Sequence, residues 1–113
     1  MPESLRVDGA ELPWRETPYP GVRFKKLEFE PPAGRSTVLL RFAPGARYGA
    51  HAHPQGEQYF VLSGSVEDSG EVWTEGAYVH HASGSRHAPY SSQGCLLFVT
   101  MPAPIVLLDE SGR

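Results

Sequence analysis

Glycine and proline interrupt this sequence so often that a long helix has no room to form. The chain holds 12 glycines and 11 prolines among its 113 residues, and no window longer than two helical turns keeps the 3.6-residue apolar period without one of them. Between them lie short runs rich in β-branched and aromatic side chains, which favour strands. Such runs occupy residues 22–29, 36–42, 58–62, 72–74, 77–81 and 96–101. The sequence therefore predicts an all-β protein, built as an antiparallel sandwich or barrel.

Two short segments have the composition of tight turns. Asp68-Ser69-Gly70 separates two apolar runs and predicts a hairpin, and Pro44-Gly45 predicts a second turn. Residues 14–21 contain prolines that cannot donate to a sheet, so we expect an irregular arm that covers a sheet edge. The chain ends, residues 1–9 and 109–113, are expected to fray.

Four candidate metal ligands are spaced so that one cavity can collect them. His51 and His53 alternate on a short extended segment, which places both imidazoles on one side of the backbone. Residues 54–56 can then turn the chain so that Glu57 returns from the next strand, which would draw three ligands from one hairpin. His87 lies in a later turn-rich strand and completes the set.

Imidazole and carboxylate ligands suit first-row divalent ions, and no thiolate narrows the choice. The spacing thus predicts one divalent transition metal, with zinc or iron expected and nickel, copper or manganese as alternatives. The competing interpretation is a scatter of surface histidines. Four of the five histidines fall in two close pairs, and Glu57 follows one pair at ligand spacing, which favours the metal site.

The second pair, His80 and His81, lies on one expected strand. Alternation lets at most one of them face the cavity, so we expect the other to face solvent. A fifth ligand is one role for the inward residue, but a hydrogen bond behind the ligands or plain exposure fits a set of four better. Cys95 has no partner cysteine and has apolar neighbours, which indicates a buried structural thiol.

Charge and length limit the classes of partner. A net charge of −3, without a basic cluster interleaved with aromatics, argues against nucleic acid. No uncharged run approaches the roughly 18 residues of a membrane span and no signal-like stretch opens the chain, so we expect no membrane partner and a cytoplasmic location. At 40% hydrophobic content the chain can form one core. We expect one domain over residues 1–113, with its core at about 14–108.

The segment that carries the first three ligands resembles the first conserved motif of the cupin superfamily. Every fixed position of that motif is present: Gly45, His51, His53, Glu57 and Gly64. Residues 76–87 resemble the second cupin motif, with Ala82 where the family usually has proline and, just beyond, Ser91 where it often has asparagine. The resemblance implies a cupin-type double-stranded β-helix, which is a jelly-roll barrel.

Within the cupins, residues 84–99 resemble the ChrR-like subgroup, named for the carboxy-terminal domain of a zinc-binding anti-sigma factor. The likeness runs from about residue 14 to residue 101, and the subgroup also resembles small metal-dependent dioxygenases that cleave diketones and hydroxyacetophenones. One implied function is a dioxygenase acting on a small ketone, diketone or phenolic compound. Another is a non-catalytic domain that senses a metal and a small molecule. A structural metal that closes a small fold is the third.

Strand alternation extends the site beyond the ligands. On the parity set by Glu57, both Tyr59 and Val61 point inward, which gives a small-molecule pocket a phenol and an apolar wall. Ordinary core packing is the alternative for Tyr59. Small cupins that resemble this chain commonly pair, and exposed sheet edges invite a partner, so we expect a homodimer with residues 14–21 as a candidate contact.

Overall fold

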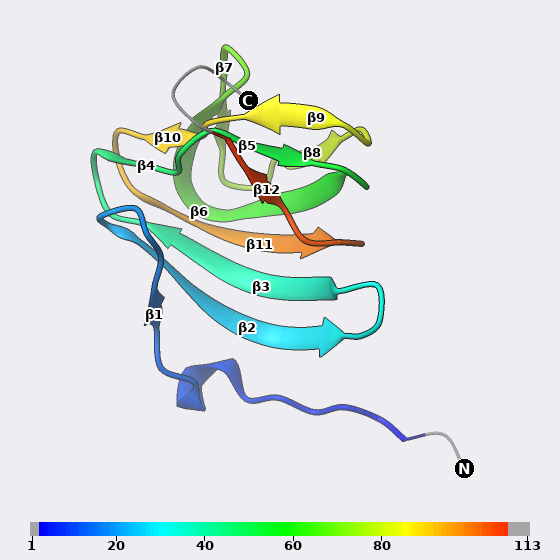
Figure 1. The fold of residues 1–113 in the computed structure, drawn as a ribbon. Coiled ribbons are helices and arrows are strands. Elements are labelled where there is room, and N and C mark those ends of the chain that lie inside the picture. The colour runs from blue at the N-terminus through cyan, green and yellow to red at the C-terminus, as the bar shows by residue number, and fades with distance from the viewer. Residues whose placement is uncertain (1–2, 109–113) are drawn as a thin grey trace.

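A curled antiparallel sheet forms the frame of the protein (Figure 1). The computed structural model describes residues 3–108, and the one helical element in this range is a short 3-10 turn, η1 (Gly9–Glu11). Each predicted run overlaps a strand, and the prediction of an all-β protein is confirmed. The strands are β1 (Arg15–Glu16), β2 (Val22–Glu30), β3 (Arg35–Phe42), β4 (Ala46–Arg47), β5 (His51–His53), β6 (Glu57–Asp68), β7 (Glu71–Thr74), β8 (Tyr78–His81), β9 (Ser85–His87), β10 (Tyr90–Ser91), β11 (Cys95–Met101) and β12 (Val106–Leu107).

Strand β6 links the parts of the main sheet because it pairs with different partners along its 12 residues. Its first half pairs with β11 and β8, and its second half pairs with β7 and β10. The main path across the sheet is β1-β2-β3-β11-β6-β10-β4, and a small sheet of order β12-β5-β9 stands apart from it. Strand β6 therefore carries its residues from one region of the curled sheet to another.

A β-bulge in β6 changes which of its side chains point inward. Leu97 of β11 pairs with Val61 and the preceding Leu96 pairs with Ser63, so Leu62 is the extra residue. Gly64, directly after the bulge, has a φ of 77° and lies against the Gly94 carbonyl, where a β-carbon would clash. The buried positions shift parity across this point, from Glu57, Tyr59 and Val61 before it to Val66 and Asp68 after it.

The two predicted turns are confirmed. Ser69 and Gly70 have φ values of 53° and 83° between the paired residues Asp68 and Glu71, which is the geometry of a two-residue type I′ hairpin. Strand β6 thus runs one residue into the segment that was expected to be turn. At Pro44-Gly45, the Ala46 N–H donates to the Ala43 carbonyl at 3.0 Å, which closes the turn between β3 and β4.

The amino-terminal arm covers the free edge of β2, partly as a regular strand. Residues 15–16 form β1 and pair with β2, with Arg15 opposite Phe24, so the arm is less irregular than expected. Residues 3–8 are exposed and precede η1. The expected fraying at residues 1–2 and 109–113 lies outside the described residues. Within residues 3–108, no helix is long and apolar enough to span a membrane.

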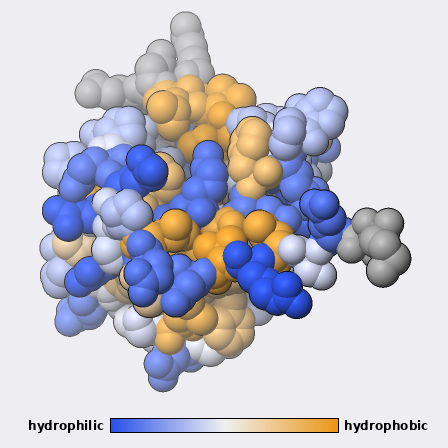
Figure 2. All heavy atoms as spheres, turned by 90° about the horizontal axis from the view of Figure 1, so that it is seen from below, coloured by the Kyte–Doolittle hydropathy of each residue, from blue (hydrophilic) through white to orange (hydrophobic). Residues whose placement is uncertain are grey.

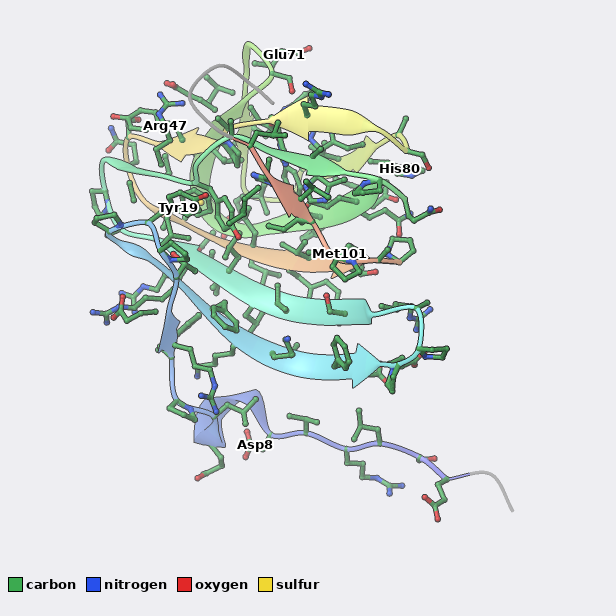
Figure 3. All side chains as sticks on the ribbon, viewed as in Figure 1. Asp8, Tyr19, Arg47, Glu71, His80 and Met101 are labelled. Carbon is green, nitrogen blue, oxygen red and sulfur yellow. The ribbon has the colours of Figure 1, made fainter. Side chains whose placement is uncertain are left out.

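The core lies between the main sheet and the strands that face it. Its buried apolar residues are Val22, Val38, Phe42, Ala46, Tyr59, Val61, Val66, Cys95, Leu97 and Val99. Burial raises the pKa of the Cys95 thiol to about 11, which fits the expected structural role. Side chains fill the space between β6 and the small sheet (Figure 3). Seen from the β2 side, apolar side chains gather near the centre of the surface with hydrophilic ones around them (Figure 2).

Candidate metal centre

Three strands bring the four predicted ligands together. β5 carries His51 and His53, β9 ends at His87 and β6 begins at Glu57. The antiparallel register pairs His51 directly with His87, so both imidazoles leave neighbouring strands on the same side. All four residues are buried, with exposed fractions from 1% to 8%.

The turn at residues 54–56 returns Glu57 toward the histidines, but it does not close a hairpin. Gly56 donates its N–H to the His53 carbonyl at 3.0 Å, and its φ of 86° lies in the left-handed region that favours glycine. Strand β5 pairs with β9 and β12, whereas β6 pairs with strands of the main sheet. The expectation that one hairpin supplies three ligands is therefore wrong, because this turn crosses from the small sheet to the main sheet.

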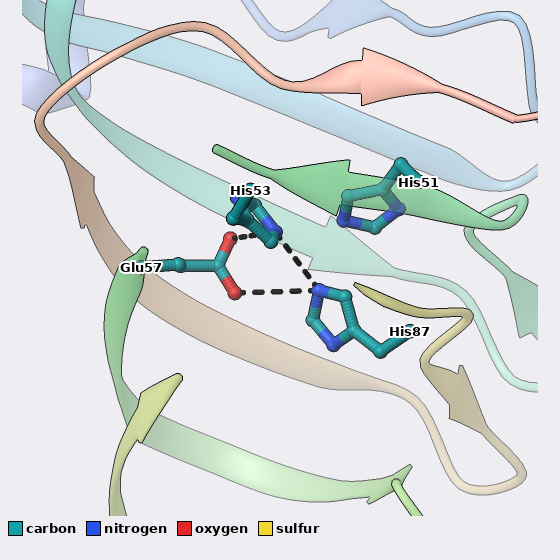
Figure 4. A group of neighbouring side chains, drawn as sticks. All are labelled: His51, His53, Glu57 and His87. Carbon is teal, nitrogen blue, oxygen red and sulfur yellow. Dashed lines mark hydrogen bonds and ion pairs between the residues drawn. The ribbon is translucent and has the colours of Figure 1, made fainter. Parts of the chain in front are cut away.

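The ligand atoms of the four side chains converge (Figure 4). One ligand atom from each residue lies within 4.8 Å of all the others. His53 Nε2 is 2.9 Å from His87 Nε2 and 3.1 Å from Glu57 Oε2, and His87 Nε2 is 3.5 Å from Glu57 Oε1. The His51 ring centroid lies 4.4 Å from that of His87. The four side chains thus surround one point.

Hydrogen bonds on the outer side of two rings decide which nitrogen faces that point. His51 Nδ1 lies 2.8 Å from the Gly49 carbonyl oxygen, which can only accept, so Nδ1 carries the proton. His87 Nδ1 lies 2.9 Å from Asp68 Oδ1, and the same argument applies when Asp68 is ionised. In the neutral rings, both Nε2 atoms then keep a lone pair for a metal ion.

Burial keeps the histidines in the state that metal binding needs. It lowers the pKa of His51 to about 4 and that of His53 to about 3, so both imidazoles are neutral at pH 7. Burial, and then the charge of Asp68, raises the pKa of Glu57 to about 8. In the absence of a cation the Glu57 carboxyl group is therefore mainly protonated at pH 7, because an ionised carboxylate has no positive partner there.

The donor set fits a divalent metal ion. Lone pairs of buried imidazoles face one another and a carboxyl group at distances that a cation would make favourable. His53 Nδ1 is buried and is the side-chain polar atom within residues 3–108 for which no hydrogen-bond partner is found. The other ring nitrogen, His53 Nε2, faces His87 Nε2 and Glu57 Oε2, so it is the nitrogen that a metal ion would take as a ligand. The buried His/Glu group can hold a metal.

Sequence reasoning missed Asp68, which it assigned to a turn. The structure buries Asp68 to 2% exposure behind His87. Its carboxylate accepts hydrogen bonds from Tyr59 at 2.6 Å, His81 at 2.8 Å and His87 at 2.9 Å. The signal that could have found it is Gly64, since a glycine inside a strand pattern suggests a bulge, and a bulge would turn Asp68 inward.

The second histidine pair divides as alternation requires. His80 is exposed and His81 is half-buried. His81 lies opposite Glu57 in the register of β8 and β6, and its ring centroid is 4.5 Å from that of His87. Its Nε2 reaches Asp68 rather than the ligand cluster, so His81 belongs to the hydrogen bonds behind the ligands.

A cavity of about 310 Å³ opens beside the ligand cluster. His51, Glu57 and Tyr59 line the end nearest the ligands, whereas Val61 is fully buried in the core and is not among the lining residues. Apolar side chains supply most of the remaining wall, among them Phe24, Phe29, Val38, Leu40, Leu97, Val99, Met101 and Ile105.

Two tyrosines stand at the ligand end of this cavity. The Tyr59 hydroxyl donates to Asp68, so its proton is already engaged. Tyr48, which sequence reasoning did not identify, lines the cavity with its ring centroid 4.6 Å from that of His51. Burial raises the pKa of Tyr48 to about 12, with further contributions from Tyr19 and Glu57, so its phenol stays protonated near neutral pH.

Solved structures share this fold at low sequence identity. A proposed acetylacetone dioxygenase from Methylibium petroleiphilum PM1 has a TM-score of 0.92 and 18% identity, with 100% of this chain and 86% of that chain covered. An acetylacetone dioxygenase from Acinetobacter johnsonii has a TM-score of 0.85 and 17% identity, covering 100% and 82%. The anti-sigma ChrR, in the complex with SigE from Rhodobacter sphaeroides, has a TM-score of 0.70 and 22% identity, covering 81% and 49%.

These likenesses confirm the predicted cupin-type jelly roll. A comparison with curated proteins gave no match. The sequence matches the profile of the ChrR Cupin-like domain over residues 2–103, nearly its whole length. This chain is therefore a member of the ChrR Cupin-like domain family.

Proposed function

We propose that this protein is a mononuclear metal enzyme, a dioxygenase acting on a small ketone, diketone or phenolic compound. In this proposal His51, His53, Glu57 and His87 hold one divalent transition metal, with zinc or iron expected and nickel, copper or manganese as alternatives. The observation that carries it is the convergence of four ligand atoms within 4.8 Å at the end of an apolar cavity.

The charge of the site favours an anionic oxygen ligand. Three neutral imidazoles and one carboxylate leave a net charge of +1 around a divalent ion, which suits an enolate or phenolate. A bound metal would polarise such an oxygen as a Lewis acid, and a redox-active one would also support reaction with dioxygen. Tyr48 keeps its proton at neutral pH and lines the same end, so it can donate a hydrogen bond to a ligand oxygen.

The cavity limits the ligand to a small, mainly apolar molecule. Its volume of about 310 Å³ lies near the lower end of the range for ligand pockets, roughly 300–1,000 Å³. Val38 and Leu40 of β3 and Leu97 and Val99 of β11 form an apolar wall for the ligand body. A ligand with an oxygen-bearing head at the metal and a short apolar body against this wall fits the cavity. The shared fold with acetylacetone dioxygenases supports the choice of reaction class.

Oxygen consumption tests this function. Protein loaded separately with iron, nickel, copper, manganese or zinc is offered β-diketones and hydroxyacetophenones in an oxygen electrode. We expect uptake with a redox-active metal and none with zinc, which has no accessible redox state. Tyr48→Phe should raise KM more than it lowers kcat, because it removes a donor to the ligand and leaves the metal ligands in place.

The alternative functions make different predictions in the same experiment. A metal- and ligand-sensing domain would show no oxygen uptake in any metal form, but these compounds would still raise its melting temperature. The fold likeness to the anti-sigma ChrR supports that alternative. A structural metal would give neither oxygen uptake nor a thermal shift with ligand, and its removal would lower the melting temperature.

We further propose that the protein forms a homodimer through the convex face of the main sheet, which is the side that points away from the core and the ligand cluster. Tyr78, Phe60 and Phe98 are aligned neighbours on β8, β6 and β11, and they point away from the core. Their exposed fractions are 58%, 40% and 37%. A row of exposed aromatic side chains of this kind is suited to burial against a second copy.

A further inference from the structure

Asp68 is the centre of a buried set of hydrogen bonds behind the metal ligands. Its Oδ1 accepts from His87 Nδ1 at 2.9 Å and from Ser69 Oγ at 3.1 Å. Its Oδ2 accepts from the Tyr59 hydroxyl at 2.6 Å and from His81 Nε2 at 2.8 Å. A carboxylate offers about four acceptor positions, so these four donors saturate it.

The ionised form of Asp68 determines which atoms carry protons. Four donors converge on its two carboxylate oxygens, and only the ionised carboxylate, which has no proton of its own, can accept from all of them. The carboxylate is therefore an acceptor only. His87 must carry a proton on Nδ1, and His81 must carry one on Nε2.

We propose that Asp68 is a positioning residue for the metal centre, fixing the tautomer and orientation of His87 so that its Nε2 lone pair faces the ligand cluster. This inference rests on the proposed metal centre for its functional meaning. The geometry supports it because His87 Nε2, opposite the Asp68 contact, lies 2.9 Å from His53 Nε2 and 3.5 Å from Glu57 Oε1. A carboxylate hydrogen-bonded to the outer nitrogen also makes the imidazole a stronger ligand.

The same carboxylate connects the ligand cavity to the metal ligand. Tyr59 lines the cavity and donates to Asp68, which in turn holds His87. The bulge at Leu62 and the left-handed backbone conformation of Gly64 turn Asp68 inward at the end of β6. Strand β8 adds His81 from the opposite side. Three strands thus fix the orientation of one imidazole.

A second metal ion is the competing interpretation, since Asp68, His81 and His87 also have potential ligand atoms within 4.8 Å of one another. The contacts of Asp68 argue against it. Four donors already occupy the acceptor positions of its carboxylate. An ion at Asp68 would have to displace at least one of them.

Nitrogen-15 NMR of the metal-free protein tests the tautomer directly. In the wild type we expect His87 to carry its proton on Nδ1 and none on Nε2, seen from the chemical shifts of its two ring nitrogens. Asp68→Asn should produce a mixture of tautomers, because an amide can turn either its oxygen or its NH₂ group toward His87. A wild-type His87 in the Nε2–H form would overturn the proposal without the need for any variant.

Metal affinity gives the second measurement. Competition with a chelator should show a loss of about 10- to 100-fold for Asp68→Asn, the usual effect of losing such a partner. Ser69→Ala is the matched control, because it removes one hydrogen bond to Asp68 without touching His87, and its affinity should match that of the wild type. Metal content should stay at one ion per chain throughout. Wild-type affinity in a folded Asp68→Asn protein would contradict the proposal.

Two further outcomes separate this inference from the proposed function. Two ions per wild-type chain, falling to one in Asp68→Asn, would replace the positioning role with a second metal site. A wild-type protein that binds no metal but holds His87 in the Nδ1–H form would contradict the proposed metal centre. It would still support the control of His87 by Asp68.

Discussion

Asp68 and His87 meet through a 2.9 Å contact between Oδ1 and Nδ1, on the side of the imidazole opposite its contacts with Glu57 and His53. The two residues come from β6 and β9, which do not pair with each other. The contact therefore ties the main sheet to the small sheet directly behind the candidate ligands. The orientation of one ligand thus depends on the curvature of the main sheet.

Metal content provides the first prediction. Wild-type protein should contain about one transition-metal ion per chain, and His53→Ala or His87→Ala should weaken metal binding by more than the roughly 100-fold that a lost outer partner costs. His80→Ala is the matched control, since His80 is exposed and lies on β8 next to His81, which contacts Asp68. Elemental analysis after reconstitution and desalting measures the content. A metal-free wild type after reconstitution would contradict the assignment.

Proton release on metal binding provides the second prediction. Glu57, with a pKa of about 8, is mainly protonated at pH 7 without metal, whereas His51 and His53 are already neutral. Metal binding at pH 7 should therefore release close to one proton, and affinity should rise with pH until about pH 8. Calorimetry in buffers of different ionisation enthalpy measures this number. Binding without proton release would show that Glu57 is ionised before the metal arrives.

The stability of the metal-free protein should depend on pH in the opposite direction. The folded chain holds the Glu57 proton up to about pH 8, while the unfolded chain loses it near 4.5. Stability from this group is complete below pH 4.5 and is lost as the pH rises through 8. The lowered pKa values of His51 and His53 act oppositely, but only below their ordinary value of 6.5.

Between pH 6.5 and 8 the contribution of Glu57 should therefore dominate, and metal-free protein should lose stability as pH rises. Glu57→Gln has no such proton and should remove most of the slope. Urea denaturation at several pH values measures both. Equal slopes for the wild type and Glu57→Gln would contradict the raised pKa.

Gly64 provides a prediction about the bulge. Gly64→Ala combines a φ of 77° with a clash against the Gly94 carbonyl, while Gly70→Ala has a φ of 83° and open space around its β-carbon. Gly70→Ala should cost about 1–2 kcal/mol for the left-handed conformation alone. We expect Gly64→Ala to cost more in urea denaturation and also to weaken metal binding, because Asp68 depends on the bulge. Equal losses for the two variants would remove the special role of Gly64.

The proximity of His51, His53 and Glu57 could be expected from sequence because it is local: alternation places the two histidines on one side, and a three-residue turn separates His53 from Glu57. His87 lies 34 residues after His53, and its place opposite His51 depends on how β9 pairs with β5. The placement of Asp68 could not be predicted in this way, because one extra residue at Leu62 reverses the parity of everything after it. The pairing of β5 with β9 and β12 could not be predicted either, since residues 54–56 are compatible both with a hairpin and with a crossing between sheets.

The last prediction concerns the convex face of the main sheet. On this face η1 covers β2, and Lys25 Nζ donates a hydrogen bond to the Gly9 carbonyl at 2.8 Å. Phe60 and Phe98 on the same face are exposed. Light scattering should give twice the chain mass of 12.4 kDa at micromolar concentration. Phe98→Lys should shift the protein to a monomer and leave metal content unchanged, because this face points away from the ligands. Val72→Lys, at a 59% exposed position on β7, is the matched control and should remain dimeric. A wild-type mass of one chain would reject the dimer, and a dimeric Phe98→Lys protein would place its interface elsewhere.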